Sequence, residues 1–278
     1  MATILDEIVE RKKAEVAERK AAMPMADIER AARTEAPARD FVGSLTAPLG
    51  NLRAAIIGEI KRQSPSAGWI RPEYEPRGSE RDDFEPENIA RRYHQAGARA
   101  ISCLTDEQSF GGHLSYIERI RSAVPLPVIR KDFMVDLWQI FESRAAGADA
   151  VLLIAECLTD EQIAAMIGAA VELGMGILLE SHDEENLGRS TELAARLHPD
   201  RVLIGINNRD LRIMKVDLGH TVRLAGKVPD AGMLVSESGI KTPGDLNRLA
   251  QAGVHIALVG EHLMAQADPG AALGELLG

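Results

Sequence analysis

The chain has 278 residues, of which 45% are apolar and 4% aromatic, and its formal net charge is −10. This length and apolar fraction suffice for one large α/β domain or two small ones, and the acidic balance disfavours non-specific nucleic-acid binding. No stretch approaches the roughly 18 apolar residues of a membrane span, and the charged N-terminal segment does not resemble a signal peptide, so we expect a cytoplasmic protein.

The N-terminal segment 1–50 precedes the first strand-like run. Its pattern predicts an amphipathic helix over about residues 4–21. A looser stretch follows, up to residue 50. We interpret 1–50 as an extension packed on the main fold, so that residues 1–278 form a single domain.

Short, continuous apolar runs then recur along the chain. They span 54–60, 98–104, 126–132, 148–155, 175–181, 201–207, 232–238 and 254–260. Apolar runs without alternation are typical of strands buried on both faces of a parallel sheet. The sequence therefore predicts eight such strands.

Helix-like stretches separate these runs. Several begin with start signals, Thr159 and Thr242-Pro243, and several end in glycines, namely Gly97, Gly147, Gly174 and Gly253. The strands recur about every 29 residues, the size of one βα unit. Eight units predict an α/β fold of the (β/α)8 TIM-barrel type. The alternative is an open doubly wound sheet, which usually has a glycine-rich first turn, whereas the turn here reads KRQSPSAGW.

Charged and polar residues cluster where the predicted strands end, which is where barrel enzymes carry their chemistry. Glu59 and Lys61 lie two apart and therefore share a face of the first strand. Later strands end with Lys131, Glu156, Glu180, Asn207, Arg209, Glu237 and Ser238. One Glu–Lys pair is often only a structural ion pair. Polar groups at the same end of many strands instead predict a site whose mutual charges shift pKa values.

The turns after the last two strands suit a phosphate. Gly239 follows the seventh strand, and Gly260 with Glu261 follows the eighth, each opening a turn into a helix. Backbone N–H groups at such turns bind phosphate in many barrels, although either glycine alone is an ordinary turn residue.

Seven motifs resemble the indole-3-glycerol-phosphate synthase family. They read EIKRQSPSAGWI, LTDEQSFGG, LPVIRKDFMVD, AAGADAVLLIAE, IGINNRDL, LVSESGI and LVGEHLM, in order and over most of the chain. The resemblance implies a carboxy-lyase of tryptophan biosynthesis that needs no metal or organic cofactor. It acts on 1-(2-carboxyphenylamino)-1-deoxyribulose 5-phosphate, and the family favours a monomer.

The resemblance also implies roles for individual residues. Lys131 matches the acid and Glu180 the base, while Glu59 matches a carboxylate that orients the lysines. Lys61 matches a lysine that binds substrate, and how the two lysines divide the acid steps stays open. Asn207 and Ser238 complete the catalytic set. The substrate-binding residues implied are Ser64, Phe110, Phe133, Arg209 and Glu237, and the phosphate-binding residues are Gly239, Gly260 and Glu261.

Two features depart from the family pattern. His262 stands at the phosphate turn where the family usually has serine, which puts one phosphate contact in doubt. The segment 71–83 is longer than the usual link after the first strand, and we expect it to be mobile, with part of it closing over the substrate. We interpret the other histidines as surface or satisfied groups without metal-ligand spacing, and Cys103 and Cys157 as buried apolar residues.

Three other functions remain open at this point. One is a Schiff-base aldolase that uses Lys131 or Lys61. Another is an isomerase acting on a neighbouring phosphosugar. The third is a non-catalytic phosphosugar-binding homologue. The only ligand that the sequence implies is a small phosphorylated molecule.

Overall fold

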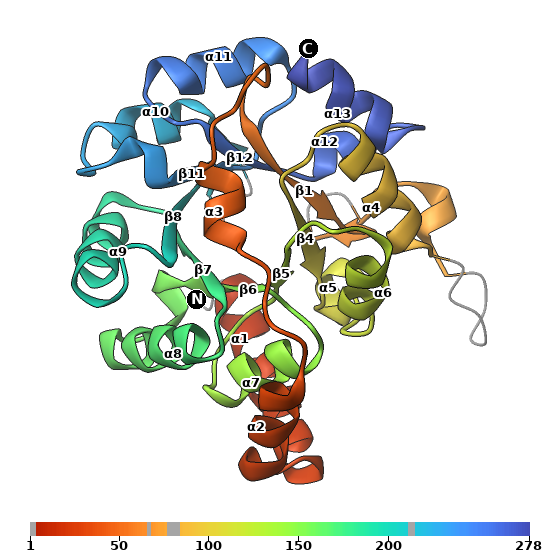
Figure 1. Cartoon of the computed structure of the whole chain (residues 1–278), viewed down its shortest axis with the longest axis vertical. Helices are drawn as coiled ribbons and strands as arrows, with labels where there is room; N and C mark the ends of the chain where they lie inside the picture. Colours follow the sequence, from red (N-terminus) through yellow and green to blue (C-terminus); the bar gives the residue numbers. More distant parts are fainter. Residues whose placement is uncertain (1–3, 66–67, 77–83, 211–214) are drawn as a thin grey trace.

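A closed barrel of eight parallel strands forms the centre of the molecule (Figure 1). The computed structural model describes residues 4–65, 68–76, 84–210 and 215–278. The barrel strands are β1 (Ala55–Ile60), β4 (Ala100–Leu104), β5 (Val128–Lys131), β6 (Ala150–Ile154), β7 (Gly176–Ser181), β8 (Val202–Asn207), β11 (Leu234–Glu237) and β12 (Ile256–Val259). Each lies within one predicted apolar run, and β12 pairs with β1 to close the barrel. The predicted TIM barrel is confirmed.

Helices surround the barrel (Figure 1). The longer ones are α4 (Pro86–Gln95), α6 (Tyr116–Ala123), α7 (Trp138–Ala145), α8 (Asp160–Glu172), α9 (Glu184–Leu197), α10 (Gly219–Ala225), α11 (Pro243–Gln251) and α13 (Pro269–Leu277). Thr159 and Thr242 form capping boxes at the starts of α8 and α11. The four predicted terminating glycines all have positive φ values, a conformation that glycine adopts without strain.

Short elements complete the loops at the ends of the strands. They are α5 (Glu107–Phe110), α12 (Glu261–Met264), the 3-10 turns η1 (Pro72–Tyr74), η2 (Ala155–Cys157) and η3 (Ala231–Met233), and the small antiparallel pairs β2 (Gln63–Ser64) with β3 (Gly68–Trp69) and β9 (Arg209–Asp210) with β10 (Lys215–Val216). Among the described residues, no helix is long and apolar enough to cross a membrane.

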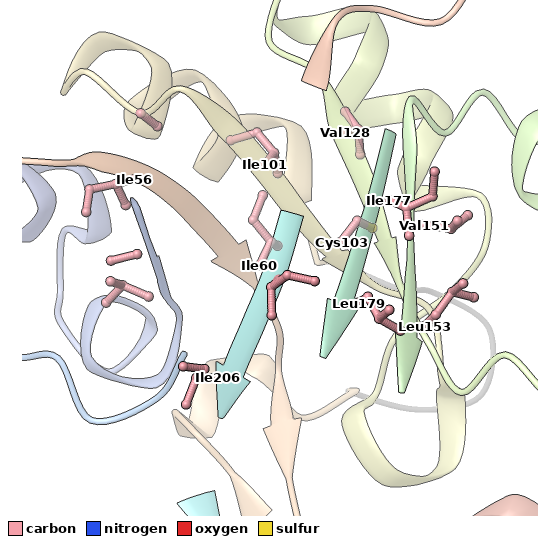
Figure 2. Close-up of a cluster of buried hydrophobic side chains, with 14 of the residues drawn as sticks. Ile56, Ile60, Ile101, Cys103, Val128, Val151, Leu153, Ile177, Leu179 and Ile206 are labelled. Atoms are coloured by element: carbon pink, nitrogen blue, oxygen red, sulfur yellow. The ribbon is translucent and has the colours of Figure 1, made fainter. Parts of the chain in front are cut away.

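Two hydrophobic cores explain why the strands show no alternation. Ile56, Ile177 and Leu179 belong to the core between the barrel and the helices, part of which Figure 2 shows. Ile57 and Leu178, their neighbours in sequence, belong to the core inside the barrel. Both faces of each strand are therefore buried, and a period of two still decides which side chains point inward.

The N-terminal extension covers both ends of the barrel. It consists of α1 (Ile4–Ala22), α2 (Met25–Thr34) and α3 (Phe41–Thr46). In Figure 1, α3 lies across the end where the strands begin, and Phe41 and Leu45 join the inner core there. At the other end, Leu5 and Ile8 of α1 line the cavity at the barrel mouth.

The buried face of α1 is not purely apolar, unlike the amphipathic helix that the sequence predicts. Ile8 and Val16 are buried, but Lys12 between them is only 3% exposed. Its Nζ lies 2.9 Å from Asp106 Oδ2 and 3.1 Å from Asp132 Oδ1. Buried charges are tolerated when they are paired in this way, so α1 is held in place by ion pairs as well as by apolar contacts.

The expected mobility of the 71–83 segment stays a prediction. Its beginning has regular structure, since Pro72–Tyr74 forms η1 and the Tyr74 side chain is buried against Phe84. Residues 77–83 lie outside the described part of the chain. Cys103 is buried as expected, whereas Cys157 is only partly buried.

Candidate active site

A cavity of about 710 Å³ opens at the ends of the barrel strands. The fourteen residues assigned from the family resemblance line it: Glu59, Lys61, Ser64, Phe110, Lys131, Phe133, Glu180, Asn207, Arg209, Glu237, Ser238, Gly239, Gly260 and Glu261. Glu156, the other strand-end candidate, is not among the lining residues. A more open hollow of about 1130 Å³ lies beside α3 at the opposite end. We place the site at the first cavity, because it collects charged groups from the C-terminal ends of the strands.

Lys131 is the centre of the charged cluster in this cavity. Its Nζ donates to Glu180 Oε2 at 2.9 Å and to Glu237 Oε2 at 3.1 Å. Burial favours the neutral amine, but the charges of Glu180, Glu237 and Glu59 outweigh it and raise the pKa of Lys131 well above its usual range. Lys131 is therefore a stable ammonium group.

Glu180 and Glu237 lie on either side of this ammonium and differ in their titration. Burial works against ionisation of Glu180, yet the charges of Lys131 and His182 and hydrogen bonds from Lys131 and Asn207 lower its pKa. Burial and the charge of Glu180 raise the pKa of Glu237, against the opposing charge of Lys131. The two carboxyl groups therefore titrate at different pH, and Glu180 is the one that loses its proton first.

Glycine makes room for Glu237 on the neighbouring strand. A Cβ atom at Gly205 would lie 2.4 Å from Glu237 Oε1. Gly205 belongs to β8, whose inward face lies between those of β7 and β11. The missing side chain is thus what lets the carboxylate lie between the strands.

Glu59 and Lys61 form the ion pair that their spacing suggests. Lys61 Nζ lies 2.7 Å from Glu59 Oε1, and both side chains line the cavity. Gly260 makes room for this pair, because a Cβ there would lie 2.3 Å from Glu59 Oε1. Glu59 orients Lys61 directly, whereas it acts on Lys131 only through its charge.

Asn207 and Ser238 form a polar bridge beside Glu180. Asn207 Nδ2 donates to Glu180 Oε1 at 3.0 Å, and Ser238 Oγ donates to Asn207 Oδ1 at 2.9 Å. Ser238 has a φ of 69°, the one positive value among described non-glycine residues. Such strained positions concentrate at functional sites.

Arg209 and Glu261 lie at the rim of the cavity. Arg209 Nη2 donates to Glu261 Oε2 at 2.8 Å. The Glu261 carboxylate is thus paired with a cation, and its negative charge would repel a phosphate. Any phosphate contact by Glu261 must therefore come from its backbone N–H.

The remaining phosphate candidates surround the same end of the cavity. Gly239 and Gly260 line it, together with Lys241 and His262. Burial and the nearby charge of Lys241 lower the pKa of His262. The imidazole of His262 thus lines the cavity at the phosphate turn, where the family usually has serine.

Two aromatic rings and a small polar residue form another part of the cavity lining. The ring centroids of Phe110 and Phe133 are 6.2 Å apart, with 35° between the ring planes. Ser64 of β2 is buried and lines the cavity on the side of β1.

Sequence reasoning missed several residues that shape the site. Gly205 carried a signal, since a glycine inside an apolar strand often marks a close approach. His182 lies two residues after Glu180 and on the same face, and its Nε2 is 3.2 Å from Glu180 Oε1. Within the described part of the chain, no group of three or more His, Cys, Asp or Glu residues is arranged to hold a metal ion.

Solved structures support the fold. The 3-hexulose-6-phosphate synthase from Salmonella typhimurium superposes with a TM-score of 0.58 at 13% identity, covering 80% of this chain and 96% of that one. The N-acetylmannosamine-6-phosphate 2-epimerase from Clostridium perfringens gives a TM-score of 0.53 at 16% identity, over 81% and 90% of the two chains. At such identities the likeness concerns the fold alone.

Sequence relatives define the family. The indole-3-glycerol phosphate synthase of Rhodospirillum rubrum is 45% identical over 278 residues, covering 100% of both chains. That of Polaromonas sp. (strain JS666) is 43% identical over 278 residues, covering 100% of this chain and 99% of its own. The family model for indole-3-glycerol phosphate synthase matches residues 5–276. The chain therefore belongs to the indole-3-glycerol phosphate synthase family.

Proposed function

We propose that this chain converts 1-(2-carboxyphenylamino)-1-deoxyribulose 5-phosphate to indole-3-glycerol phosphate, releasing carbon dioxide and water. Membership of the family makes the chain a decarboxylating lyase of tryptophan biosynthesis. One observation supports the residue assignment above all. The Lys131 ammonium lies 2.9 Å from Glu180 and 3.1 Å from Glu237. The pKa of Glu180 is lowered and that of Glu237 is raised. All three groups line the cavity together with the other predicted polar residues.

The first step is closure of the five-membered ring. The aromatic carbon that bears the carboxyl group forms a bond to the C2′ carbonyl carbon, and negative charge develops on the carbonyl oxygen. In our proposal, the Lys131 ammonium stabilises this charge and supplies the proton. Lys131 carries the proton when the substrate arrives, because even the ordinary pKa of a lysine lies well above neutral pH.

Loss of carbon dioxide and then of water completes the reaction. The carboxyl group departs as carbon dioxide, leaving its electron pair to restore the aromatic ring. The C2′ hydroxyl leaves as water after protonation, and a proton is removed from C1′ to form the indole double bond. Lys61 is positioned by Glu59 to assist the leaving hydroxyl, and Glu180, the more ionised carboxylate, takes the last proton.

The remaining residues bind the substrate. We assign Asn207, Ser238 and Arg209 to its polar groups, with Glu237 and Ser64 beside them. Phe110 and Phe133 provide the walls for the aromatic ring. The backbone N–H groups at Gly239, Gly260 and Glu261 bind the phosphate. We also propose that the enzyme is a monomer, which the mass measured by light scattering would test.

The Schiff-base aldolase is disfavoured by the ionisation of Lys131. A lysine nucleophile must be neutral when it attacks a carbonyl. The three carboxylates around Lys131 instead raise its pKa. Borohydride should therefore fail to trap a covalent adduct with a ketose phosphate.

The direct test is to supply the carboxyphenylamino-deoxyribulose phosphate to the purified protein and follow the fluorescence of the indole product. We expect turnover without added metal or cofactor. No product at saturating substrate from a folded protein would refute the assignment.

A further inference from the structure

His182 occupies a place beside the active site that the proposed reaction does not yet use. It is the first residue after β7, two positions beyond Glu180. Its side chain is 12% exposed, and its Nε2 lies 3.2 Å from Glu180 Oε1. Nε2 is buried and forms no hydrogen bond with any described residue, so the contact with Glu180 is one of charge.

Glu156 of η2 contacts His182 at its backbone N–H and at the ring nitrogen that does not face Glu180. Its Oε1 accepts from the His182 backbone N–H at 2.7 Å. Its Oε2 lies 3.2 Å from His182 Nδ1. One carboxylate thus fixes both the main chain and the ring, which leaves the ring little freedom to turn its Nε2 away from Glu180.

The two contacts decide the charge of the ring. Hydrogen bonding to Glu156 requires a proton on Nδ1. A neutral ring would then place an uncharged, electron-rich Nε2 3.2 Å from a Glu180 carboxylate oxygen, with no positive charge to offset it. An imidazolium donates its Nδ1 proton to Glu156 and places positive charge beside Glu180. The geometry is therefore satisfied only by the charged ring, or by a proton placed on a carboxylate instead.

The surroundings of the ring are otherwise acidic. Burial lowers the pKa of His182, but the hydrogen bond to Glu156 and the charges of Glu180, Glu156 and Glu237 raise it overall.

Three further groups complete these surroundings. Lys131 lies beyond Glu180, and His220 of α10 approaches the His182 carbonyl with its Nε2 at 3.0 Å. Cys157 is neutral, because burial and the charges of Glu156, Glu180 and Asp6 raise the pKa of its thiol to about 12.

We propose that His182 is a positioning residue of this active site. Glu156 fixes its ring, and the imidazolium keeps the Glu180 carboxylate ionised and in place beside Lys131. The catalytic part of this inference rests on the proposed function. The charge of the ring does not, and it is tested without substrate.

The first experiment measures that charge. Long-range ¹H–¹⁵N spectra of the full-length protein, labelled at histidine, are recorded from pH 5 to pH 9, and His182→Gln identifies the signal. We expect both ring nitrogens to be protonated at pH 7. The titration midpoint should fall by about 1 pH unit in Glu180→Gln and in Glu156→Gln, since each variant removes a neighbouring negative charge.

Glu192→Gln is the matched control, because Glu192 is exposed on α9 and should leave the midpoint unchanged. A ring that is neutral at pH 7 in the wild-type protein would overturn the proposal. So would a midpoint that is the same in the wild type, Glu180→Gln and Glu156→Gln. Two independent carboxylate variants keep the test decisive if one of them fails to fold.

The second experiment measures the consequence for activity. In His182→Gln and His182→Asn, Glu180 loses a positive neighbour and holds its proton up to higher pH. We expect the acidic limb of the kcat/KM profile to move up by about 1 pH unit in both variants. The loss of activity should be larger at pH 6 than at pH 8, because the wild-type ring loses its own charge as the pH rises.

His255→Gln is the control here, since His255 is exposed at the opposite end of the barrel, next to the start of β12. A uniform loss with an unmoved acidic limb would show a merely structural role and overturn the proposal. Failure of the proposed function looks different. The wild-type enzyme would then form no product, while the histidine titration would still decide the charge of His182.

Discussion

At the scale of single residues, the site depends on one cation held between carboxylates. Removing Lys131 as Lys131→Ala, or replacing the Glu180 carboxylate by an amide as Glu180→Gln, should lower kcat by about 10²–10⁴-fold. The reason is that each variant removes a proton donor or acceptor that our mechanism requires. Steady-state kinetics measures the effect, and circular dichroism checks that the fold is intact.

Lys227→Ala is a suitable control, because Lys227 is exposed and pairs only with Glu184 among the described residues. Near-wild-type turnover in either active-site variant would remove that residue from the mechanism.

Two glycines matter as much as the charged residues. In Gly205→Ala, the new methyl carbon would lie 2.4 Å from Glu237 Oε1. In Gly260→Ala, it would lie 2.3 Å from Glu59 Oε1. Both distances are too short for the carboxylates to stay in place. Both oxygens end flexible side chains, so the carboxylates should move. At Gly260 the new methyl group would also lie 2.9 Å from Glu59 Cβ, so the backbone there must shift slightly as well. Displacement of this size at a reacting centre should cost about 100-fold in kcat/KM.

Gly188→Ala is the matched control for these glycine variants. It lies inside α9, and beyond its chain neighbours and the backbone of its own helix no atom of the described residues lies within 4 Å of the site of its Cβ. Alanine there should be neutral or stabilise the helix by up to about 1 kcal/mol. Equal activity in all three glycine variants would mean that the carboxylate positions are unimportant.

At the scale of elements, α1 is the part of the fold that connects the extension to the site. Lys12→Met removes the ammonium between Asp106 and Asp132 and leaves two buried carboxylates with fewer partners. Breaking such a pair costs about 3–5 kcal/mol. We therefore expect α1 to detach more often, exposing its amides to hydrogen exchange, and KM to rise because Leu5 and Ile8 line the cavity.

Lys13→Met controls for the loss of a charge from the same helix. The Lys13 side chain is 57% exposed, and it pairs with the exposed Glu10. Unchanged exchange of the α1 amides in Lys12→Met would show that apolar contacts alone hold the helix.

At the scale of the whole molecule, buried charge pairs make stability depend on pH. Burial disfavours the charged form of Asp132, but Arg130, Lys12 and hydrogen bonds from Thr105 and Arg130 lower its pKa from 3.8 to about 2. Because the folded-state pKa is depressed, this group stabilises the fold above pH 4. That contribution, about 2 kcal/mol, is lost as the pH falls from 4 to 2.

Urea unfolding at a series of pH values measures this loss. In Asp132→Asn, the part of the pH dependence that comes from this group should disappear. An equally steep decline in the variant would exclude Asp132 as its source.

The same unfolding curves test whether the chain is one domain, as we propose. Trp138 packs with Val16 and Ile28 of the extension, and its Nε1 donates to the Met23 carbonyl. If extension and barrel unfold together, Trp138 fluorescence and far-ultraviolet circular dichroism should change at the same urea concentration.

Much of the barrel follows from local pattern. Continuous apolar runs predicted all eight strands, because a strand buried on both faces must be apolar on both. Glu59 with Lys61 was predicted to share a face because the period of a strand is two. The start and end signals of the helices are confirmed as well, because a helix cap is made by residues that lie close together in the chain.

What only the tertiary structure decided are contacts between residues far apart in sequence. Lys131 meets Glu237 across 106 positions and Lys12 meets Asp132 across 120, and no local period encodes either pair. Three further features arise only when the barrel closes. They are the burial of Lys12, the space that Gly205 leaves for Glu237 and the contacts of Glu156 with His182. The sequence by itself thus determined which residues end the strands, whereas closure of the barrel determined which charges face each other and hence how they ionise.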